Sequence, residues 1–131
     1  MINPNNEKNK RILLVDDEDD ITRLVRMVLE NNGFRVYAYT DPAEALSNFK
    51  AGLYDLLLLD IRMPEMNGLE LYQKMKQIDS NAKVCFITAS ELFYEEYRRM
   101  EIHPWLDKAY FIQKPFRNEE MIEQIKAIIF S

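Results

Sequence analysis

The chain has 131 residues, of which 47% are hydrophobic and 30% are charged. A chain of this length and apolar content can bury one hydrophobic core, which excludes a disordered or fibrous protein and predicts a single domain. Its 17 Lys and Arg residues against 22 Asp and Glu residues give a formal net charge of -5. This negative charge argues against direct binding to nucleic acid or to an anionic membrane surface.

The start of the chain and its single cysteine indicate where the protein works. Residues 1–9 lack the apolar stretch of a secretory signal and are expected to form a solvated tail ahead of one domain at residues 10–131. Cys85 lies in an apolar run, so a buried, reduced thiol is expected. Together these features favour a cytoplasmic protein.

From Lys10 onward, short apolar runs alternate with longer segments whose apolar residues recur at helical spacing. This alternation predicts an α/β fold with a parallel sheet, and the lack of polar alternation within the runs predicts strands covered on both faces. The strands are expected at residues 11–15, 34–39, 54–59, 82–88 and 109–112. The helices are expected at residues 19–31, from Asp41 onward, and at 66–77, 91–100 and 118–130.

Two helix ends carry recognisable sequence signals. Asp41, Pro42 and Glu44 supply an N-cap acceptor, a proline at the first helical position and an acid able to reach back to the cap. At the end of the first predicted helix, Gly33 is suited to the left-handed backbone of a C-cap. These signals support helices that begin at Asp41 and end just before Gly33.

Acidic residues follow two of the predicted strands. Asp16 and Asp17 come after the first strand and Asp60 after the third. Right-handed crossovers place all strand-to-helix loops at one end of a parallel sheet, so these carboxylates should meet there. Two such charges about 4 Å apart interact by roughly 1–4 kcal/mol, and hard oxygen ligands favour Mg²⁺ as the ion that neutralises them. The alternative is that these acids only cap helices.

A hydroxyl and an ammonium group are expected at the same end of the sheet. Thr88 ends the fourth predicted strand and Lys114 follows the fifth. Each residue alone is common in such a place. Together with a divalent ion they supply the positioning and charge neutralisation that phosphoryl transfer needs, and Asp60, on the central strand, is the best-placed nucleophile.

Four motifs in this order resemble those of the receiver domain of two-component response regulators, from about Lys10 to the end of the chain. They are Leu13-Leu14-Val15-Asp16-Asp17-Glu18, Asp60-Ile61-Arg62-Met63-Pro64-Glu65-Met66-Asn67-Gly68, Ile87-Thr88-Ala89 and Lys114-Pro115-Phe116. The resemblance implies a doubly wound, flavodoxin-like (βα)5 fold with strand order 2-1-3-4-5. It also implies a signalling switch that accepts a phosphoryl group and is not a conventional turnover enzyme.

The resemblance assigns roles residue by residue. Asp60 would take the phosphoryl group from a phosphohistidine on a sensor kinase or phosphotransfer protein. Asp16, Asp17, Asp60 and the backbone carbonyl of Arg62 would hold Mg²⁺. Lys114 would pair with the phosphoryl oxygens, Thr88 would hydrogen-bond to them, and Phe111 would be the aromatic residue that changes rotamer. The Lys114–Pro115 peptide would be cis.

In the family, phosphorylation changes the surface that would here be formed by residues 91–100, 109–112 and 118–130. That surface would control a partner protein or an output domain, and it could pair two copies of the chain. Between Thr88 and Lys114 this chain is longer than the family pattern and rich in aromatic residues, which we interpret as core contacts in preference to a partner surface. His103, in that stretch, is expected to be an exposed loop residue.

Two other functions share part of this chemistry. A Mg²⁺-dependent phosphatase would use Asp60 as its nucleophile, but the short chain offers no evident general acid or substrate cap. A receiver-like binding module that works without phosphorylation would keep the fold, although every chemical position of the family is filled here.

Overall fold

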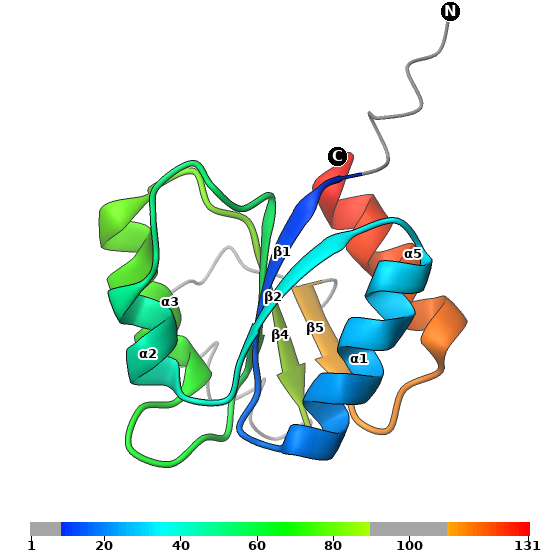
Figure 1. The fold of residues 1–131 in the computed structure, drawn as a ribbon, viewed down its shortest axis with the longest axis horizontal. Helices are drawn as coiled ribbons and strands as arrows, with labels where there is room; N and C mark the ends of the chain where they lie inside the picture. Colours follow the sequence, from blue (N-terminus) through cyan, green and yellow to red (C-terminus); the bar gives the residue numbers. More distant parts are fainter. Residues whose placement is uncertain (1–8, 90–109) are drawn as a thin grey trace, which may run out of the picture.

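The computed structural model describes residues 9–89 and 110–131, and in these residues it has a five-stranded parallel sheet at its centre (Figure 1). The strand order is β2-β1-β3-β4-β5, which confirms the predicted fold class. The strands are β1 (Arg11–Val15), β2 (Arg35–Tyr39), β3 (Leu56–Asp60), β4 (Val84–Thr88) and β5 (Phe111–Gln113).

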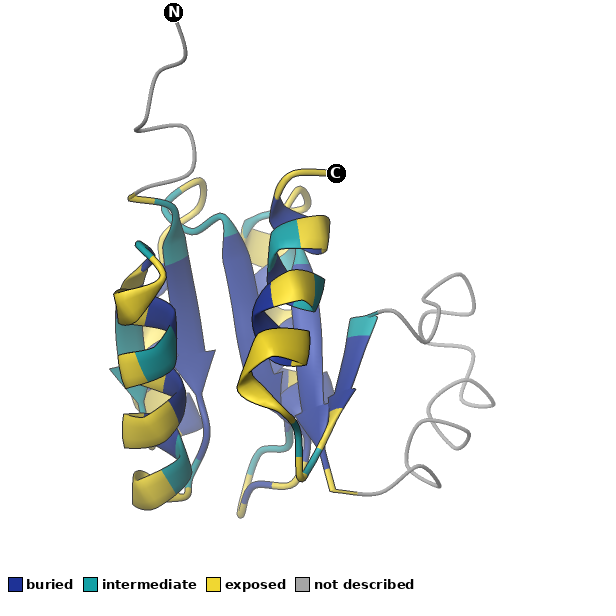
Figure 2. Cartoon of the chain, turned by 90° about the vertical axis from the view of Figure 1, so that its right-hand side faces the viewer, coloured by how far each residue is buried: buried dark blue, intermediate teal, exposed yellow. Residues whose placement is uncertain are grey.

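Helices cover both faces of the sheet. They are α1 (Asp19–Asn31), α2 (Pro42–Ser47), α3 (Gly68–Ile78) and α5 (Asn118–Ile129). Helices α1 and α5 lie on one face and α2 and α3 on the other, so the exposed sides of the helices form the surface and the central strands β1, β3 and β4 stay buried (Figures 1 and 2). The predicted helix at 91–100 and most of the predicted tail at 1–9 lie outside the described residues. Among the described helices, none has the length and apolar character needed to cross a membrane.

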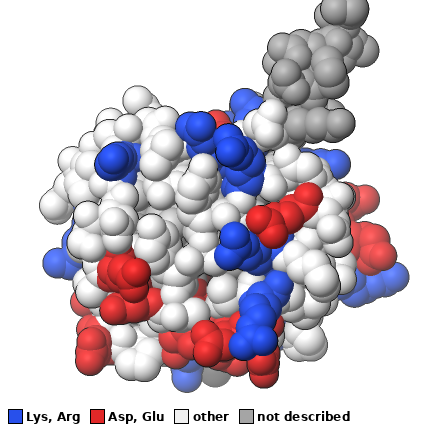
Figure 3. Space-filling view, in the orientation of Figure 1, with Lys and Arg blue, Asp and Glu red and all other residues white. Residues whose placement is uncertain are grey.

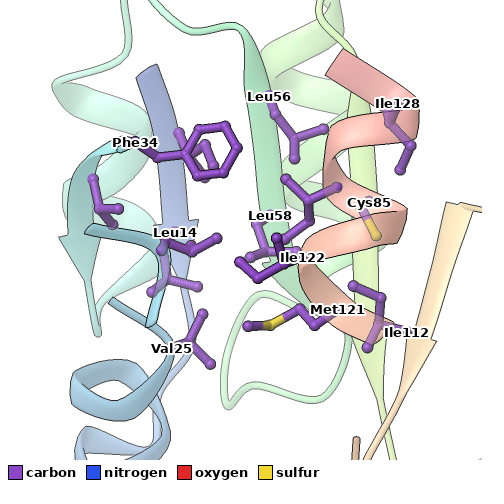
Figure 4. Close-up of a cluster of buried hydrophobic side chains, with 14 of the residues drawn as sticks. Leu14, Val25, Phe34, Leu56, Leu58, Cys85, Ile112, Met121, Ile122 and Ile128 are labelled. Carbon is purple, nitrogen blue, oxygen red and sulfur yellow. The ribbon is translucent and has the colours of Figure 1, made fainter. Parts of the chain in front are cut away.

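Alternate residues of the central strands build two hydrophobic layers. Leu13, Leu57 and Leu59 pack toward α2 and α3. Leu14 and Leu58 pack toward α1 and α5, where Val25, Met121 and Ile122 meet them (Figure 4). Since a fully buried leucine side chain stabilises a fold by about 1.5–3 kcal/mol, the leucine run of β3 anchors both layers. This double burial explains why the strands read as continuous apolar runs.

Asp41, Pro42 and Gly33 take the geometry that their helix-end signals predict. The Asp41 carboxylate accepts a hydrogen bond from the Ala43 N–H at 3.0 Å, ahead of Pro42 at the first position of α2. After α1, Gly33 has φ of 90°, a left-handed backbone that suits glycine.

The third strand and helix are shifted from their predicted bounds. Strand β3 begins at Leu56, two residues late, because Asp55 bridges to β1: its N–H donates to the Arg11 carbonyl and its carboxylate accepts from the Arg11 N–H, each at 2.8 Å. The strand also runs one residue further, through Asp60. Helix α3 begins at Gly68, two residues late, because Asn67 forms a capping box with Glu70.

The other bounds differ by one or two residues. Strand β2 begins at Arg35, one residue late, and β4 at Val84, two residues late. Strand β5 begins at Phe111 and ends at Gln113, one residue beyond the predicted end, and α5 ends at Ile129. These shifts leave the predicted acids, Thr88 and Lys114 at the carboxyl end of the sheet, whereas Phe111 is the first residue of β5.

Candidate functional site

Four acidic side chains meet where the strands end. Asp16 follows β1, and Asp60 is the last residue of β3, whose neighbour in the sheet is β1. Carboxylate oxygens of Asp16, Asp17, Glu18 and Asp60 all lie within 4.8 Å of one another. In Figure 3, Asp and Glu side chains gather along the lower edge, the end toward which the strands of Figure 1 point. The expected meeting of Asp16, Asp17 and Asp60 is therefore present, with Glu18 in addition.

Hydrogen bonds fix the loop that carries three of these acids. The buried Asp16 carboxylate accepts from the Glu18 N–H at 3.0 Å. The Thr22 hydroxyl on α1 lies 2.9 Å from the Asp16 carbonyl and 2.8 Å from the Glu18 carbonyl. The backbone from Asp16 to Glu18 is thus held against the first turns of α1, which sets the direction in which the acidic side chains leave it.

Lys114 brings a cation into the acidic cluster. Its Nζ lies 3.1 Å from Asp16 Oδ2, 3.3 Å from Glu18 Oε1 and 3.8 Å from Asp60 Oδ2. Its backbone N–H donates to the Thr88 carbonyl at 2.7 Å, and the following bond to Pro115 is cis. Lys114 therefore lies at the end of the sheet, as its position after the fifth strand predicted.

The charged groups of the site shift the pKa values of Asp60 and Lys114. Burial, the neighbouring Asp16 and Asp17 carboxylates and a hydrogen bond to Asp16 raise the pKa of Asp60 to about 7, even though Lys114 acts to lower it. Burial acts to lower the pKa of Lys114, but Asp60, Asp16 and Glu18 outweigh it and leave that pKa above its usual value. One lysine does not neutralise four carboxylates, and a set of hard oxygen donors fits a divalent cation such as Mg²⁺.

The loop after β3 is packed tightly against Asp60. A Cβ atom at Gly68 would lie 2.3 Å from the Asp60 carbonyl oxygen, so only glycine allows α3 to start there. The Gly68 N–H donates to the Ile61 carbonyl at 2.9 Å. Within the loop, Glu65 has φ of 68°, and the Met66 N–H donates across it to the Pro64 carbonyl at 2.7 Å. This hydrogen bond defines a γ-turn of the strained kind.

The remaining predicted site residues, Thr88, Phe111 and Arg62, lie in β4, in β5 and in the loop after Asp60. Thr88 is buried at the end of β4, next to β3 in the sheet. Phe111 is buried in β5, and its ring centroid lies 5.4 Å from that of Phe86. Arg62 is exposed in the loop that follows Asp60. Cys85 is fully buried, and burial raises the pKa of its thiol, as expected of a core residue.

Two features of the site were not predicted. The sequence pattern indicates Glu18 only as an acid near a helix start, yet its side chain contacts Lys114, 96 residues away. The pattern indicates Gly68 only as part of a motif and does not predict the close approach to Asp60 that requires glycine. The motif spacing from Asp60 could have indicated the second feature, whereas nothing in the sequence pattern indicated the first. The predicted aromatic segment Leu92, Phe93, Tyr94, Tyr97 and Trp105, with His103, lies outside the described residues.

Comparisons with known proteins agree with this geometry. Residues 12–126 match the family model of the response regulator receiver domain. The response regulator receiver protein CpdR of Brucella abortus is 31% identical over 125 residues, which cover 93% of this chain and 98% of CpdR. The alkaline phosphatase synthesis transcriptional regulatory protein PhoP of Bacillus subtilis is 31% identical over 121 residues. The match covers 92% of this chain but only 49% of PhoP, so this chain corresponds to about half of that regulator.

Solved structures show the same likeness. The response regulator protein TrrA of Thermotoga maritima, in complex with Mg²⁺-BeF, is 33% identical with a TM-score of 0.74, over 91% of this chain and 98% of TrrA. The non-phosphorylated HemR receiver domain of Leptospira biflexa is 28% identical with a TM-score of 0.79, over 92% of this chain and 94% of that domain.

Proposed function

This chain belongs to the family of response regulator receiver domains of two-component systems, and we propose that it is a signalling switch in which Asp60 accepts a phosphoryl group. One observation carries the proposal: a buried carboxylate at the end of the central strand lies among three other acids and within 3.8 Å of a lysine ammonium. That combination places a nucleophile, a site for a divalent cation and a fixed positive charge together.

The proposed donor is a phosphohistidine on a sensor kinase or phosphotransfer protein. A carboxylate oxygen of Asp60 attacks the phosphorus atom, the bond between phosphorus and the imidazole nitrogen breaks, and its electron pair returns to the imidazole. The product is an acyl phosphate on Asp60. Attack by water on this phosphorus would later release inorganic phosphate and restore the carboxylate, which would make the switch reversible.

Lys114 and Thr88 would hold the new group. The Lys114 ammonium can donate to a phosphoryl oxygen with little movement, because its Nζ is already 3.8 Å from Asp60 Oδ2. Thr88, at the end of the neighbouring strand β4, would donate its hydroxyl to another phosphoryl oxygen. Both are charge-assisted hydrogen bonds of the kind by which phosphorylation reorders a loop.

The residues that would hold Mg²⁺ are Asp16, Asp17, Asp60 and the backbone carbonyl of Arg62. The proposal is supported by the carboxylate cluster, whose oxygens suit Mg²⁺ better than a softer metal, and by the Mg²⁺-BeF bound to the related protein TrrA. When bound, the ion would neutralise charge on the phosphoryl oxygens. Asp16 and Asp17 would hold their carboxylates in place for it through the fixed loop after β1.

The signal would leave the site through Phe111. Its ring lies against Phe86 of β4, and its carbonyl accepts a hydrogen bond from the Gln124 side chain on α5 at 2.9 Å. The Phe111 ring packs in the layer on the side of the sheet opposite α5, so a change in its rotamer would alter the packing of β5 and, through the backbone contact with Gln124, the surface that β5 forms with α5. We propose that this surface, with residues 91–100, binds a target protein, an output domain or a second copy of the chain more tightly in one phosphorylation state.

Intact-mass measurement after incubation with Mg²⁺ and acetyl phosphate tests the proposal. The wild-type chain should gain the mass of one phosphoryl group and Asp60→Asn should gain none. Asp55→Asn is the matched control, since Asp55 lies at the opposite end of the sheet, and it should still be phosphorylated. Sustained hydrolysis of small phosphate esters would indicate a phosphatase instead, and a wild-type chain without adduct would indicate a binding module.

A further inference from the structure

Glu18 stands out among the acids of the site because its carboxylate lies beside the lysine and not in the interior. We propose that Glu18 is a positioning residue that holds the Lys114 ammonium away from Asp60 until Asp60 is phosphorylated. This inference rests on the proposed function, because it concerns the contact that Lys114 would make with the phosphoryl group. It adds to that function a role for Glu18, whose contact with Lys114 determines how readily the ammonium moves to the phosphoryl oxygens.

The distances around Lys114 carry the first step. An ammonium group has three N–H donors. Two of its carboxylate contacts are within hydrogen-bonding distance, to Asp16 Oδ2 at 3.1 Å and to Glu18 Oε1 at 3.3 Å. Asp60 Oδ2, at 3.8 Å, is an ion-pair neighbour but is too far away for a hydrogen bond. Lys114 is therefore directed toward the loop after β1, and Asp60 receives only its electrostatic field.

The burial of the two partners distinguishes their roles. The Asp16 side chain is fully buried, whereas 61% of the Glu18 side chain is exposed. An ion pair with a buried carboxylate is costly to break, while an exposed pair contributes little and breaks easily. When a phosphoryl group competes for the ammonium, the contact with Glu18 is the one that yields.

The local backbone supports a specific role for the Glu18 side chain. Glu18 is the N-cap residue of α1, a position that favours short side chains able to accept from the helix N–H groups, and its side chain makes no such cap. Its own N–H donates to Asp16 Oδ1, and its carbonyl accepts from the Thr22 N–H and hydroxyl. The backbone is thus fixed on both sides of the residue, and the side chain is used to contact Lys114 instead of the helix.

The substitution Glu18→Gln tests this role. Without the Glu18 carboxylate, only Asp16 still holds the ammonium away from Asp60, so the ammonium reaches the phosphoryl oxygens more easily and the rate of phosphorylation by acetyl phosphate with Mg²⁺ should rise about two- to fivefold. That range corresponds to the loss of one partly exposed ion pair. Glu18→Asp keeps the charge but shortens the side chain by one methylene group, and it should show most of the same increase.

Asp19→Asn is the matched control. It removes one negative charge from the first turn of α1, but Asp19 is not among the acids that gather at the site. If Asp19→Asn raises the rate as much as Glu18→Gln, the gain comes from weaker repulsion of the anionic donor, and the proposed role is wrong. A slower reaction in Glu18→Gln with a loss of Mg²⁺ affinity measured by calorimetry would show that Glu18 serves the metal, which also overturns the role.

A crystal structure of Glu18→Gln without a phosphodonor separates this inference from the proposed function. The distance from Lys114 Nζ to Asp60 Oδ2 should shorten from 3.8 Å into the hydrogen-bonding range. An unchanged distance contradicts the positioning role even if the wild-type chain is phosphorylated. A wild-type chain that accepts no phosphoryl group overturns the proposed function, while the distance still decides what Glu18 does to Lys114.

Discussion

Each end of the sheet holds a lysine in contact with several oxygen atoms, and the two sets of oxygen atoms differ in kind. At the carboxyl end, Lys114 lies among the carboxylates of Asp16, Glu18 and Asp60. At the amino end, Lys83 donates to backbone carbonyls at the end of α5. These are the carbonyls of Ile128, Ile129 and Ser131, at 3.0, 3.1 and 3.4 Å.

The other polar groups of the two ends follow the same division. At the amino end, the Asp55 carboxylate accepts from the Arg11 N–H, and the Asp79 carboxylate accepts from the Gly52 N–H at 2.9 Å. Charged side chains there satisfy backbone groups and so stabilise the fold. At the carboxyl end, like charges are gathered and only partly neutralised. The difference teaches that charged groups stabilise the fold at one end of the sheet, whereas at the other end they destabilise it until a proton or a cation neutralises them.

The largest expected effect is a pH dependence of stability that comes from the carboxyl end. With its pKa raised to about 7, folded Asp60 keeps a proton that the unfolded chain releases near pH 4. The free energy of unfolding without divalent cations should therefore fall by about 2–4 kcal/mol as the pH rises from 4 to 8. Urea unfolding in EDTA at several pH values measures this fall.

Two additions sharpen the pH experiment. Asp60→Asn should abolish most of the fall, whereas Asp55→Asn, at the amino end, should keep it. Mg²⁺ added at pH 8 should restore stability to the wild-type chain, because the ion favours the ionised folded site. An equal pH dependence in wild type and Asp60→Asn would contradict the assignment of this energy to Asp60.

A pair of glycines gives the next largest effect. Gly68→Ala should destabilise the fold by about 3 kcal/mol, because the new Cβ would meet the backbone of Asp60 and neither can move easily. Gly52→Ala, at the amino end, should cost about 1 kcal/mol, from its φ of 77° alone, since no atom of the described residues lies within 4 Å of its Cβ position. Thermal unfolding of the two variants compares them, and equal costs would contradict the tight packing around Asp60.

The smallest effect concerns the lysine of the amino end. Lys83→Met removes the donor to the α5 carbonyls and should lower the free energy of unfolding by about 1–2 kcal/mol, with phosphorylation by acetyl phosphate unchanged. Lys74→Met, on the exposed side of α3, is the control and should change neither. A Lys83→Met variant that loses phosphorylation while remaining folded would show that the two ends of the sheet are not independent.

The sequence predicted the fold because each strand is apolar enough to be buried on both faces. Leu57 and Leu58 point to opposite layers, and no polar residue interrupts them. The exact strand bounds were beyond the sequence pattern, since the start of β3 depends on hydrogen bonds between Asp55 and Arg11, 44 residues apart. Local propensity contains no signal for such pairings.

The candidate site, like the fold, has features that the sequence predicts and features that it does not. The meeting of Asp16, Asp17, Asp60 and Lys114 followed from one topological rule, that parallel strands end together. The contact between Glu18 and Lys114 did not follow, because it depends on two side-chain conformations and on the exact height of each loop above the sheet. Residue type and spacing thus predicted which groups lie in the site, but not which of their side chains contact one another.

The γ-turn at Glu65 suggests a direction for protein engineering. A side chain with φ of 68° is held in a backbone conformation that glycine adopts freely. Replacing Glu65 by glycine would relax the connection that leads from β3 into α3 without removing any group of the acidic cluster. Replacing this one exposed residue, three positions before Gly68, is therefore a first step toward a more stable variant of the chain for use as a biosensor scaffold.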